Sequence, residues 1–275
     1  MKKIYINFFL YALILFSIYS AVLIGMSWDE GGIVEIAKSR LRYIFSLGAV
    51  DYEPLSFSHY FPGTYPVIAM FITQLFHRSY EIEVLHIVNS FVGISAIFGI
   101  SKIAKELFNK KVGYIVFLIS FFNPVFFGHM AINQKDMIVA FANIWSTYLI
   151  LKYLKNQQIN EKRNRYVILA GLAIGLGLGV RVVFLSTLIP VFIVSFLDTL
   201  LLKKLTNKNF SFNKLIVDIL KIFIIAYILM ISCWPDTHQN IFILPFKMFI
   251  ESLNFTFGIL LSLFNGNVYN TYEIP

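Results

Sequence analysis

The sequence predicts an all-α fold, a polytopic bundle of transmembrane helices with interfacial helices on its outer face. Hydrophobic residues make up 58% of the chain and charged residues only 14%, whereas a soluble domain carries about 25% charged residues. The mean hydropathy is +0.73. The uncharged stretch over residues 4–26 is long enough to cross a bilayer at a rise of about 1.5 Å per residue. We expect residues 1–275 to form a single transmembrane domain.

Seven membrane spans are predicted from length and charge. They are residues 4–26, 84–103, 112–127, 137–154, 166–180, 182–202 and 215–234. The first begins like a signal peptide, but its apolar stretch exceeds the about 7–15 residues of a signal core, so we expect it to be retained.

The basic residues lie in alternate loops between these spans. They are Lys2 and Lys3; Lys102, Lys105, Lys110 and Lys111; Lys152, Lys155, Lys162, Arg163 and Arg165; and Lys203, Lys204, Lys208 and Lys214. The positive-inside rule places these loops and the N-terminus in the cytoplasm, with the protein in the inner (plasma) membrane. The net charge of +8 is therefore a topology signal. We expect membrane lipids as partners, and no nucleic acid.

Three segments of the outer loops are predicted to lie in the membrane interface. In the first, apolar residues recur at helical spacing from residue 33 to 45, and Lys38, Arg40 and Arg42 fall mostly on other faces. This pattern is typical of an interfacial helix whose basic residues lie level with lipid phosphates. The other two segments are residues 65–76 and 242–263. Together they predict either a roof over a cavity or a simple seal over the bundle.

The most informative motif is Trp28-Asp29-Glu30, directly after the first span. An acidic pair at a bilayer boundary is costly to bury and is not needed for anchoring. The pair is therefore a candidate for chemistry at the membrane surface. The alternative is that it only provides the polar end of a span.

A second polar segment, residues 129–136, reads His-Met-Ala-Ile-Asn-Gln-Lys-Asp between the third and fourth spans. Asp136 would begin the fourth helix, where its charge also favours the helix dipole, so capping is the alternative to chemistry. The predicted topology brings Asp29, Glu30, His129 and Asp136 to one face from different loops, as expected of a site.

A third motif is the small-residue stretch over residues 171–181, which ends in Arg181. Glycines at every fourth position let transmembrane helices approach closely, so this is not a phosphate-binding loop. Arg181 suits a phosphate group because a guanidinium pairs with it in bidentate fashion. The alternative is an arginine that extends to the interface from a helix end.

These three motifs resemble the N-terminal part of a GT-C-fold glycosyltransferase, of the bacterial protein O-mannosyltransferase and lipid A aminoarabinose transferase kind. The shared features are the acidic pair after the first span, the loop ending in Lys-Asp after the third, and the small-residue helix ending in Arg. The second loop of that family tends to read Asn-Pro-Lys-Asp, whereas this chain has Gln134 in place of the proline. The resemblance covers nearly the whole chain.

The resemblance implies a polyprenyl-phosphate-linked sugar donor and an acceptor protein, lipid or glycan on the outer side. Transfer from a phosphate needs a carboxylate to take the acceptor proton and positive charge to stabilise the departing phosphate. We predict Asp29, Glu30 and Asp136 as catalytic residues, with Asp29 as the base. Glu30 and Asp136 would orient the acceptor or hold a divalent metal ion. The predicted substrate-binding residues are Arg181, Lys135, His59 and Arg42, and His129 is a weaker metal-ligand candidate.

The main alternative is a lipid or small-molecule transporter or flippase, and a non-catalytic scaffold is a third reading. Transporters place ionisable residues near the bilayer midplane. Here the acidic residues cluster at the outer ends of spans, which favours an enzyme. The chain ends in a polar outer loop, residues 264–275, and further spans follow such a loop in the resembling family. We therefore expect a C-terminally truncated or split protein.

Overall fold

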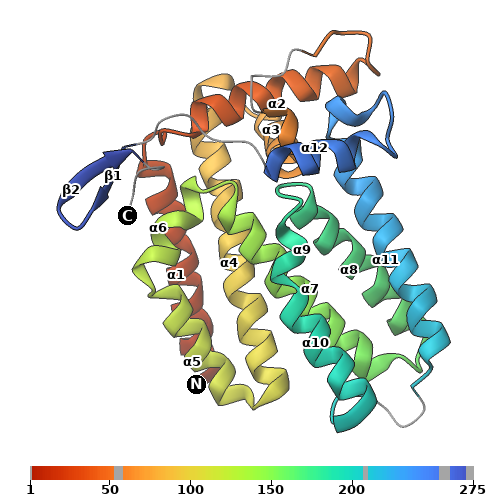
Figure 1. The fold of residues 1–275 in the computed structure, drawn as a ribbon. Coiled ribbons are helices and arrows are strands. Elements are labelled where there is room, and N and C mark those ends of the chain that lie inside the picture. The colour runs from red at the N-terminus through yellow and green to blue at the C-terminus, as the bar shows by residue number, and fades with distance from the viewer. Residues whose placement is uncertain (1, 53–57, 207–209, 254–260, 271–275) are drawn as a thin grey trace.

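The computed structural model describes residues 2–52, 58–206, 210–253 and 261–270, and they are mainly helical (Figure 1). The α-helices are α1 (Lys2–Leu23), α2 (Glu30–Phe45), α3 (Thr64–Thr73), α4 (Glu81–Leu107), α5 (Lys110–Phe121), α6 (Pro124–Ile132), α7 (Asp136–Asn156), α8 (Asn160–Leu178), α9 (Phe184–Thr187), α10 (Ile189–Leu197), α11 (Phe212–Ser232) and α12 (Leu244–Leu253). Short helical turns are η1 (Ser58–Tyr60), η2 (Arg78–Tyr80), η3 (Asp198–Leu202) and η4 (Pro235–Thr237), and the strands are β1 (Leu261–Phe264) and β2 (Asn267–Asn270).

Helix α4 lies at the centre of one half of the bundle, where it packs against α1, α5, α6 and α7. In the other half, α8 packs between α7 and α11. Figure 1 shows these long helices side by side, with α2 crossing one end of the bundle and α3 and α12 lying at the same end. The all-α prediction is confirmed, and the outer helices gather at the end where the candidate site residues were expected.

The structure corrects several of the predicted spans. Among the described residues, Arg78–Leu107, Asp136–Asn156 and Phe212–Ser232 are long and apolar enough to cross a membrane. The predicted continuous span over residues 112–127 is wrong, because the chain bends by 68° between α5 and α6. Asn123 caps α6 and Pro124 begins it. Proline lacks the N–H that would continue α5, so the chain restarts in a new direction. Counted as one bent span, α5 and α6 make a fourth.

The predicted span over residues 182–202 is likewise broken, into α9, α10 and η3. Helix α8 begins at Asn160, six residues before the predicted start, and so carries the charged segment that precedes the predicted span in its first two turns. Helices α8 and α10 still run alongside the other long helices of the bundle (Figure 1).

Two of the three predicted interfacial segments form helices α2 and α3, and the third needs correction. Helix α12 ends at Leu253, and β1 pairs with β2 in an antiparallel hairpin. The hairpin turns at Asn265 and Gly266, whose φ angles are 48° and 80°. The dipeptide Asn-Gly favours this left-handed turn, which fits the twist of the paired strands. Because Leu263 lies in strand β1, the helix predicted over residues 242–263 does not extend to Leu263.

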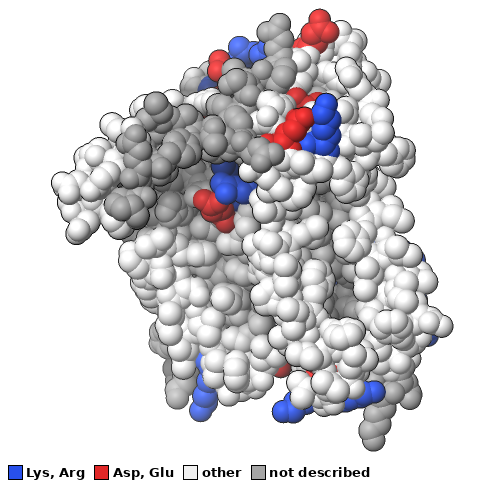
Figure 2. Space-filling model, viewed as in Figure 1, with Lys and Arg blue, Asp and Glu red and all other residues white. Residues whose placement is uncertain are grey.

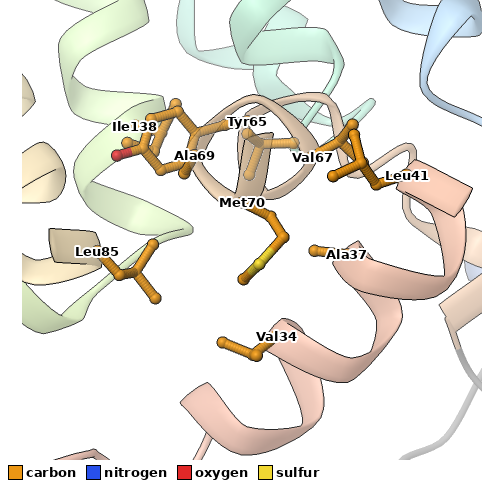
Figure 3. Close-up of a cluster of buried hydrophobic side chains, with 10 residues drawn as sticks. Val34, Ala37, Leu41, Tyr65, Val67, Ala69, Met70, Leu85 and Ile138 are labelled. Atoms are coloured by element: carbon orange, nitrogen blue, oxygen red, sulfur yellow. The ribbon is translucent and has the colours of Figure 1, made fainter. Parts of the chain in front are cut away.

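A buried apolar cluster fixes α2 and α3 on the end of the bundle. It joins α2 and α3 to Leu85 of α4 and Ile138 of α7. Figure 3 shows Met70 of α3 lying between Leu85 and the α2 side chains Val34 and Ala37. Each fully buried aliphatic side chain contributes about 1.5–3 kcal/mol to stability. The roof is therefore packed onto the spans and is not a loose cover.

The glycines predicted to allow close helix approach do so between α8 and α11. A Cβ on Gly171 would lie 2.8 Å from Ile225, and one on Gly175 would lie 2.9 Å from the Cα of Ala226. The third glycine of the series, Gly179, instead contacts Thr64 at the start of α3, whose N–H donates to the Gly179 carbonyl at 2.7 Å. The small-residue stretch thus positions both a span and part of the roof.

We expect Gly175→Ala to lower the thermal stability of the purified protein in detergent. The new methyl group meets the α11 backbone, and overpacking of this kind costs about 1–3 kcal/mol. Gly128→Ala in α6 is the matched control, because a Cβ there meets nothing within 4 Å. Equal unfolding temperatures for the two variants would contradict the close α8–α11 contact.

Candidate active site

Asp29 is the residue before α2, and its carboxylate faces outward. The side chain is 67% exposed, and its Oδ2 lies 3.7 Å from Nζ of Lys135. It makes no capping hydrogen bond to the helix it precedes. The carboxylate therefore has an open face and a single cationic neighbour, as a proton acceptor at a surface site would need.

Glu30, the other member of the acidic pair, points into the protein and is 0% exposed. Its Oε1 lies 2.9 Å from Nε2 of His86, and its Oε2 accepts the N–H of Ser27 at 2.6 Å. Burial alone raises the pKa of Glu30, but the bonds from His86 and Ser27 outweigh it and hold the pKa below its usual value. The structure thus separates the pair, and only Asp29 faces solvent.

The loop before α7 is shaped by Asn133. Its Oδ1 accepts the backbone N–H groups of Lys135 and Asp136 at 3.1 and 2.7 Å. These bonds satisfy donors at the start of the helix, and Asn133 gives the loop a fixed turn although Gln134 replaces the expected proline. The loop presents Lys135 and Asp136 together at the bundle end.

Asp136 pairs with Arg181, which follows the small-residue helix α8. Oδ1 of Asp136 lies 3.3 Å from Nη2 of Arg181, and the two side chains are 65% and 43% exposed. Together with the Asp29–Lys135 pair, the Asp136–Arg181 pair forms a row of two carboxylates and two cations, which come from three separate segments. Figure 2 shows acidic and basic side chains in contact at the head of a hollow on this face. Of the four side chains predicted to converge on one face, Asp29 and Asp136 lie together in this row, whereas Glu30 is buried.

Two cavities adjoin this row. The roof pocket, about 320 Å³, lies under α2 and the chain leading to α3. Its lining is mostly apolar, with Lys135, Arg181 and Arg40 as cations. The lateral groove, about 540 Å³, lies among α4, α5, α6 and α7 and includes Asp136. Lys135 lines the roof pocket and the adjacent Asp136 lines the lateral groove, so the row lies between the two cavities.

The lateral groove is apolar along the spans and polar at the end nearest the row. Ile97, Ile100 and Ile144 contribute apolar walls, and His129, Asn133 and Asp136 supply polar groups. The bend between α5 and α6 opens this space, because α6 turns away from the line of α5. An apolar channel that ends at charged groups suits an amphiphile with a hydrocarbon tail and a polar head.

His129, the weaker metal-ligand candidate, lines the lateral groove together with Asp136. Its Nδ1 lies 3.4 Å from the amide nitrogen of Asn133. Within the described part of the chain, no three His, Cys, Asp or Glu side chains are grouped closely enough to hold a metal ion. A divalent metal at Glu30, Asp136 and His129 stays a prediction from the sequence.

Two predicted substrate-binding residues lie away from the row. Arg42 is exposed in the last turn of α2. His59 is half-buried in η1, where its carbonyl accepts the indole N–H of Trp234 at 2.8 Å. Neither lines the roof pocket.

Arg40 is a pocket residue that the sequence did not predict. The sequence predicts it mostly off the apolar face of α2 and level with lipid phosphates, but it is 2% exposed and lines the roof pocket. It donates to the carbonyls of Ser58 and Pro62 at 2.7 and 2.6 Å. Ile36 and Ile44 lie four residues before and after Arg40, so helical spacing alone would have placed Arg40 on the apolar face of α2.

Arg40 also approaches Asp236 of η4, with 3.5 Å between Nη2 and Oδ2. The Asp236 side chain is only 5% exposed. Burial raises the pKa of Asp236 above its usual value, although the charge of Arg40 opposes that rise. The pair joins α2 to the segment that follows α11.

A bundle of membrane-spanning helices, with paired acids and bases between two apolar cavities at one end, defines a membrane protein with a site for amphiphilic substrates. The model of the dolichyl-phosphate-mannose-protein mannosyltransferase family matches residues 62–234, more than half of the chain. The chain belongs to this family and is a membrane glycosyltransferase of the mannosyltransferase type, with the GT-C fold. The match includes Lys135, Asp136 and Arg181 and begins after Asp29. No curated protein and no solved structure matches the chain.

We expect Arg40→Met to destabilise the protein strongly. It leaves Asp236 buried without its cation and two loop carbonyls without donors, and breaking a buried pair in this way costs about 3–5 kcal/mol. Arg42→Met, an exposed change on the same helix, should alter stability by no more than about 0.5 kcal/mol. Thermal unfolding in detergent compares them, and equal unfolding temperatures would contradict the role of Arg40.

Proposed function

We propose that this protein transfers a sugar from a polyprenyl-phosphate donor to an acceptor hydroxyl at the outer face of the plasma membrane. The observation that carries the proposal is the pairing of Lys135 and Arg181 with two exposed carboxylates between the two cavities. The distribution of basic residues in alternate loops supports the outer location. The acceptor is a protein, a lipid or a glycan, and family membership favours a protein.

The donor phosphate binds between Lys135 and Arg181 in this proposal. Both cations line the roof pocket, and both are already directed toward anionic groups, Asp29 and Asp136. Arg181 offers a bidentate fork that matches phosphate geometry, and Lys135 adds a compact charge. The prenyl chain lies in the lateral groove, whose apolar walls come from spanning helices.

The reaction is a single displacement at the anomeric carbon. The acceptor oxygen attacks that carbon, Asp29 takes the hydroxyl proton, and the bond from the anomeric carbon to the phosphate oxygen breaks. The bonding electrons leave with the polyprenyl phosphate, whose growing negative charge Lys135 and Arg181 stabilise. Asp136 holds Arg181 in place and faces the acceptor side, while Glu30 stays buried.

We expect Asp29→Asn to abolish most sugar transfer. The amide is nearly the same size as the carboxylate but cannot take the proton, and a general base contributes about 10²–10⁴-fold in rate. The measurement is transfer from a polyprenyl-phosphate mannose by membranes that contain the variant. Glu35→Gln, an exposed carboxylate later in α2, is the matched control and should stay active.

Other outcomes separate the roles of the carboxylates. If Asp29→Asn stays active and Asp136→Asn is inactive, Asp136 is the base. If neither change affects transfer, the enzymatic proposal fails and a transporter becomes the better description.

We expect Arg181→Gln to weaken donor binding more than Arg181→Lys, because Lys keeps the charge and loses only the bidentate fork. Binding of polyprenyl phosphate to the purified protein measures this directly. Arg165→Gln, an exposed change near the other end of α8, is the control. Donor affinity that is unchanged in both Arg181 variants would exclude the proposed phosphate contact.

A further inference from the structure

A fully buried ion pair lies directly behind Asp29. Glu30 of α2 and His86 of α4 are both 0% exposed, and Oε1 of Glu30 lies 2.9 Å from Nε2 of His86. The other ring nitrogen of His86, Nδ1, lies 3.1 Å from the carbonyl oxygen of Ala21. That carbonyl belongs to the last turn of α1, where helix geometry leaves it without a partner. One imidazole therefore joins three helices.

The neighbours of His86 fix its protons. A carbonyl oxygen can only accept, so Nδ1 carries a hydrogen and donates it to Ala21. A neutral imidazole then has no hydrogen left on Nε2, yet this atom faces the Glu30 carboxyl group. The contact needs one further proton, held between His86 and Glu30. The backbone N–H of Ser27 donates to the other oxygen of Glu30, and a hydrogen bond to a carboxylate favours its charged form, which pairs here with a charged His86.

The pair controls the turn that carries Asp29. Glu30 accepts the N–H of Ser27 at 2.6 Å, and the N–H of Glu30 donates back to the Ser27 carbonyl at 3.2 Å. These two bonds close the segment 27–30 around Asp29. His86 in turn fixes Glu30 to α4, which also packs on α6 and α7. The position of Asp29 opposite Lys135 thus depends on the buried pair.

Stability alone does not account for a charged pair in this place. Desolvation offsets much of the attraction in a buried ion pair, and well-packed apolar residues of similar volume often stabilise a protein as well or better. An apolar pair, however, would make no directional bond to Ser27 or to Ala21. What the charged pair adds is a fixed orientation of the chain at Asp29.

We infer that His86 is a positioning residue for sugar transfer, holding Asp29 in place through Glu30 and the 27–30 turn. The inference rests on the proposed role of Asp29 as the base. It predicts that loss of His86 lowers kcat and leaves the KM for the donor nearly unchanged, since the donor-binding cations lie on other segments.

The test is a double-mutant cycle with His86→Leu and Asp29→Asn in the full chain. We expect His86→Leu to lower kcat at least about 10-fold when Asp29 is present, and by no more than the about 10²–10⁴-fold that a general base contributes. In the Asp29→Asn background, the same change should cause little further loss. Transfer is measured per folded protein, with the folded fraction taken from thermal unfolding.

Asn89→Leu is the matched control. Asn89 is also 0% exposed and lies one turn further along α4, but it bonds Tyr65 and the carbonyl of Ala131. Its effect on kcat should be the same with or without Asp29. If His86→Leu folds poorly, Glu30→Met/His86→Leu removes both charges and should fold while kcat stays low.

Three results would overturn the inference. One is a kcat for His86→Leu equal to that of the unmodified protein. Another is an equal fold-loss in both Asp29 backgrounds, which marks a general structural role. The third is full activity of Glu30→Met/His86→Leu. Wild-type transfer by Asp29→Asn alone would refute the role of Asp29 as the base, and with it the inference, whereas the proposed function itself fails only if Asp136→Asn also leaves transfer unchanged, so the two failures are distinguishable.

Discussion

The end of the bundle that carries α2 and α3 is organised by the need to satisfy one buried guanidinium, that of Arg40. A guanidinium carries five donors and keeps its charge, so when it is removed from water its partners must come from the protein. Ser58 and Pro62 provide carbonyls, and Asp236 provides a countercharge. A Cβ on Gly63 would overlap the guanidinium, so the chain passes this point as glycine with a φ of 78°. The roof pocket owes its shape to this arrangement.

Two adjacent carboxylates reach opposite environments because of helix geometry. Successive residues at a helix start project about 100° apart, since a turn holds about 3.6 residues. Glu30 therefore enters the bundle and meets His86, while Asp29 stays at the surface beside Lys135. Environments that differ this much separate the properties of chemically similar groups. Under the proposed function, the same motif thus supplies one reactive group and one structural group.

The sequence was sufficient to predict the helical class, two of the outer helices and the convergence of Asp29 with the second loop. These features depend on local composition and on the side of the membrane that a loop occupies. Periodicity could also have placed Arg40 on the buried face of α2. His86 was beyond such reasoning, because its partner Glu30 lies 56 residues away and only the packing of α4 against α1 and α2 brings them together. The bend at Pro124 was missed because hydropathy is continuous across it.

That bend links the membrane to the site. Had residues 112–127 formed one straight span, it would have run alongside α4 without a break. Instead α6 turns by 68°, and the groove opens among α4, α5, α6 and α7. The groove ends at Asp136, the neighbour of Lys135 and the partner of Arg181. Under the proposed function, a prenyl chain can therefore enter sideways from the bilayer while its phosphate reaches both cations without leaving the membrane surface.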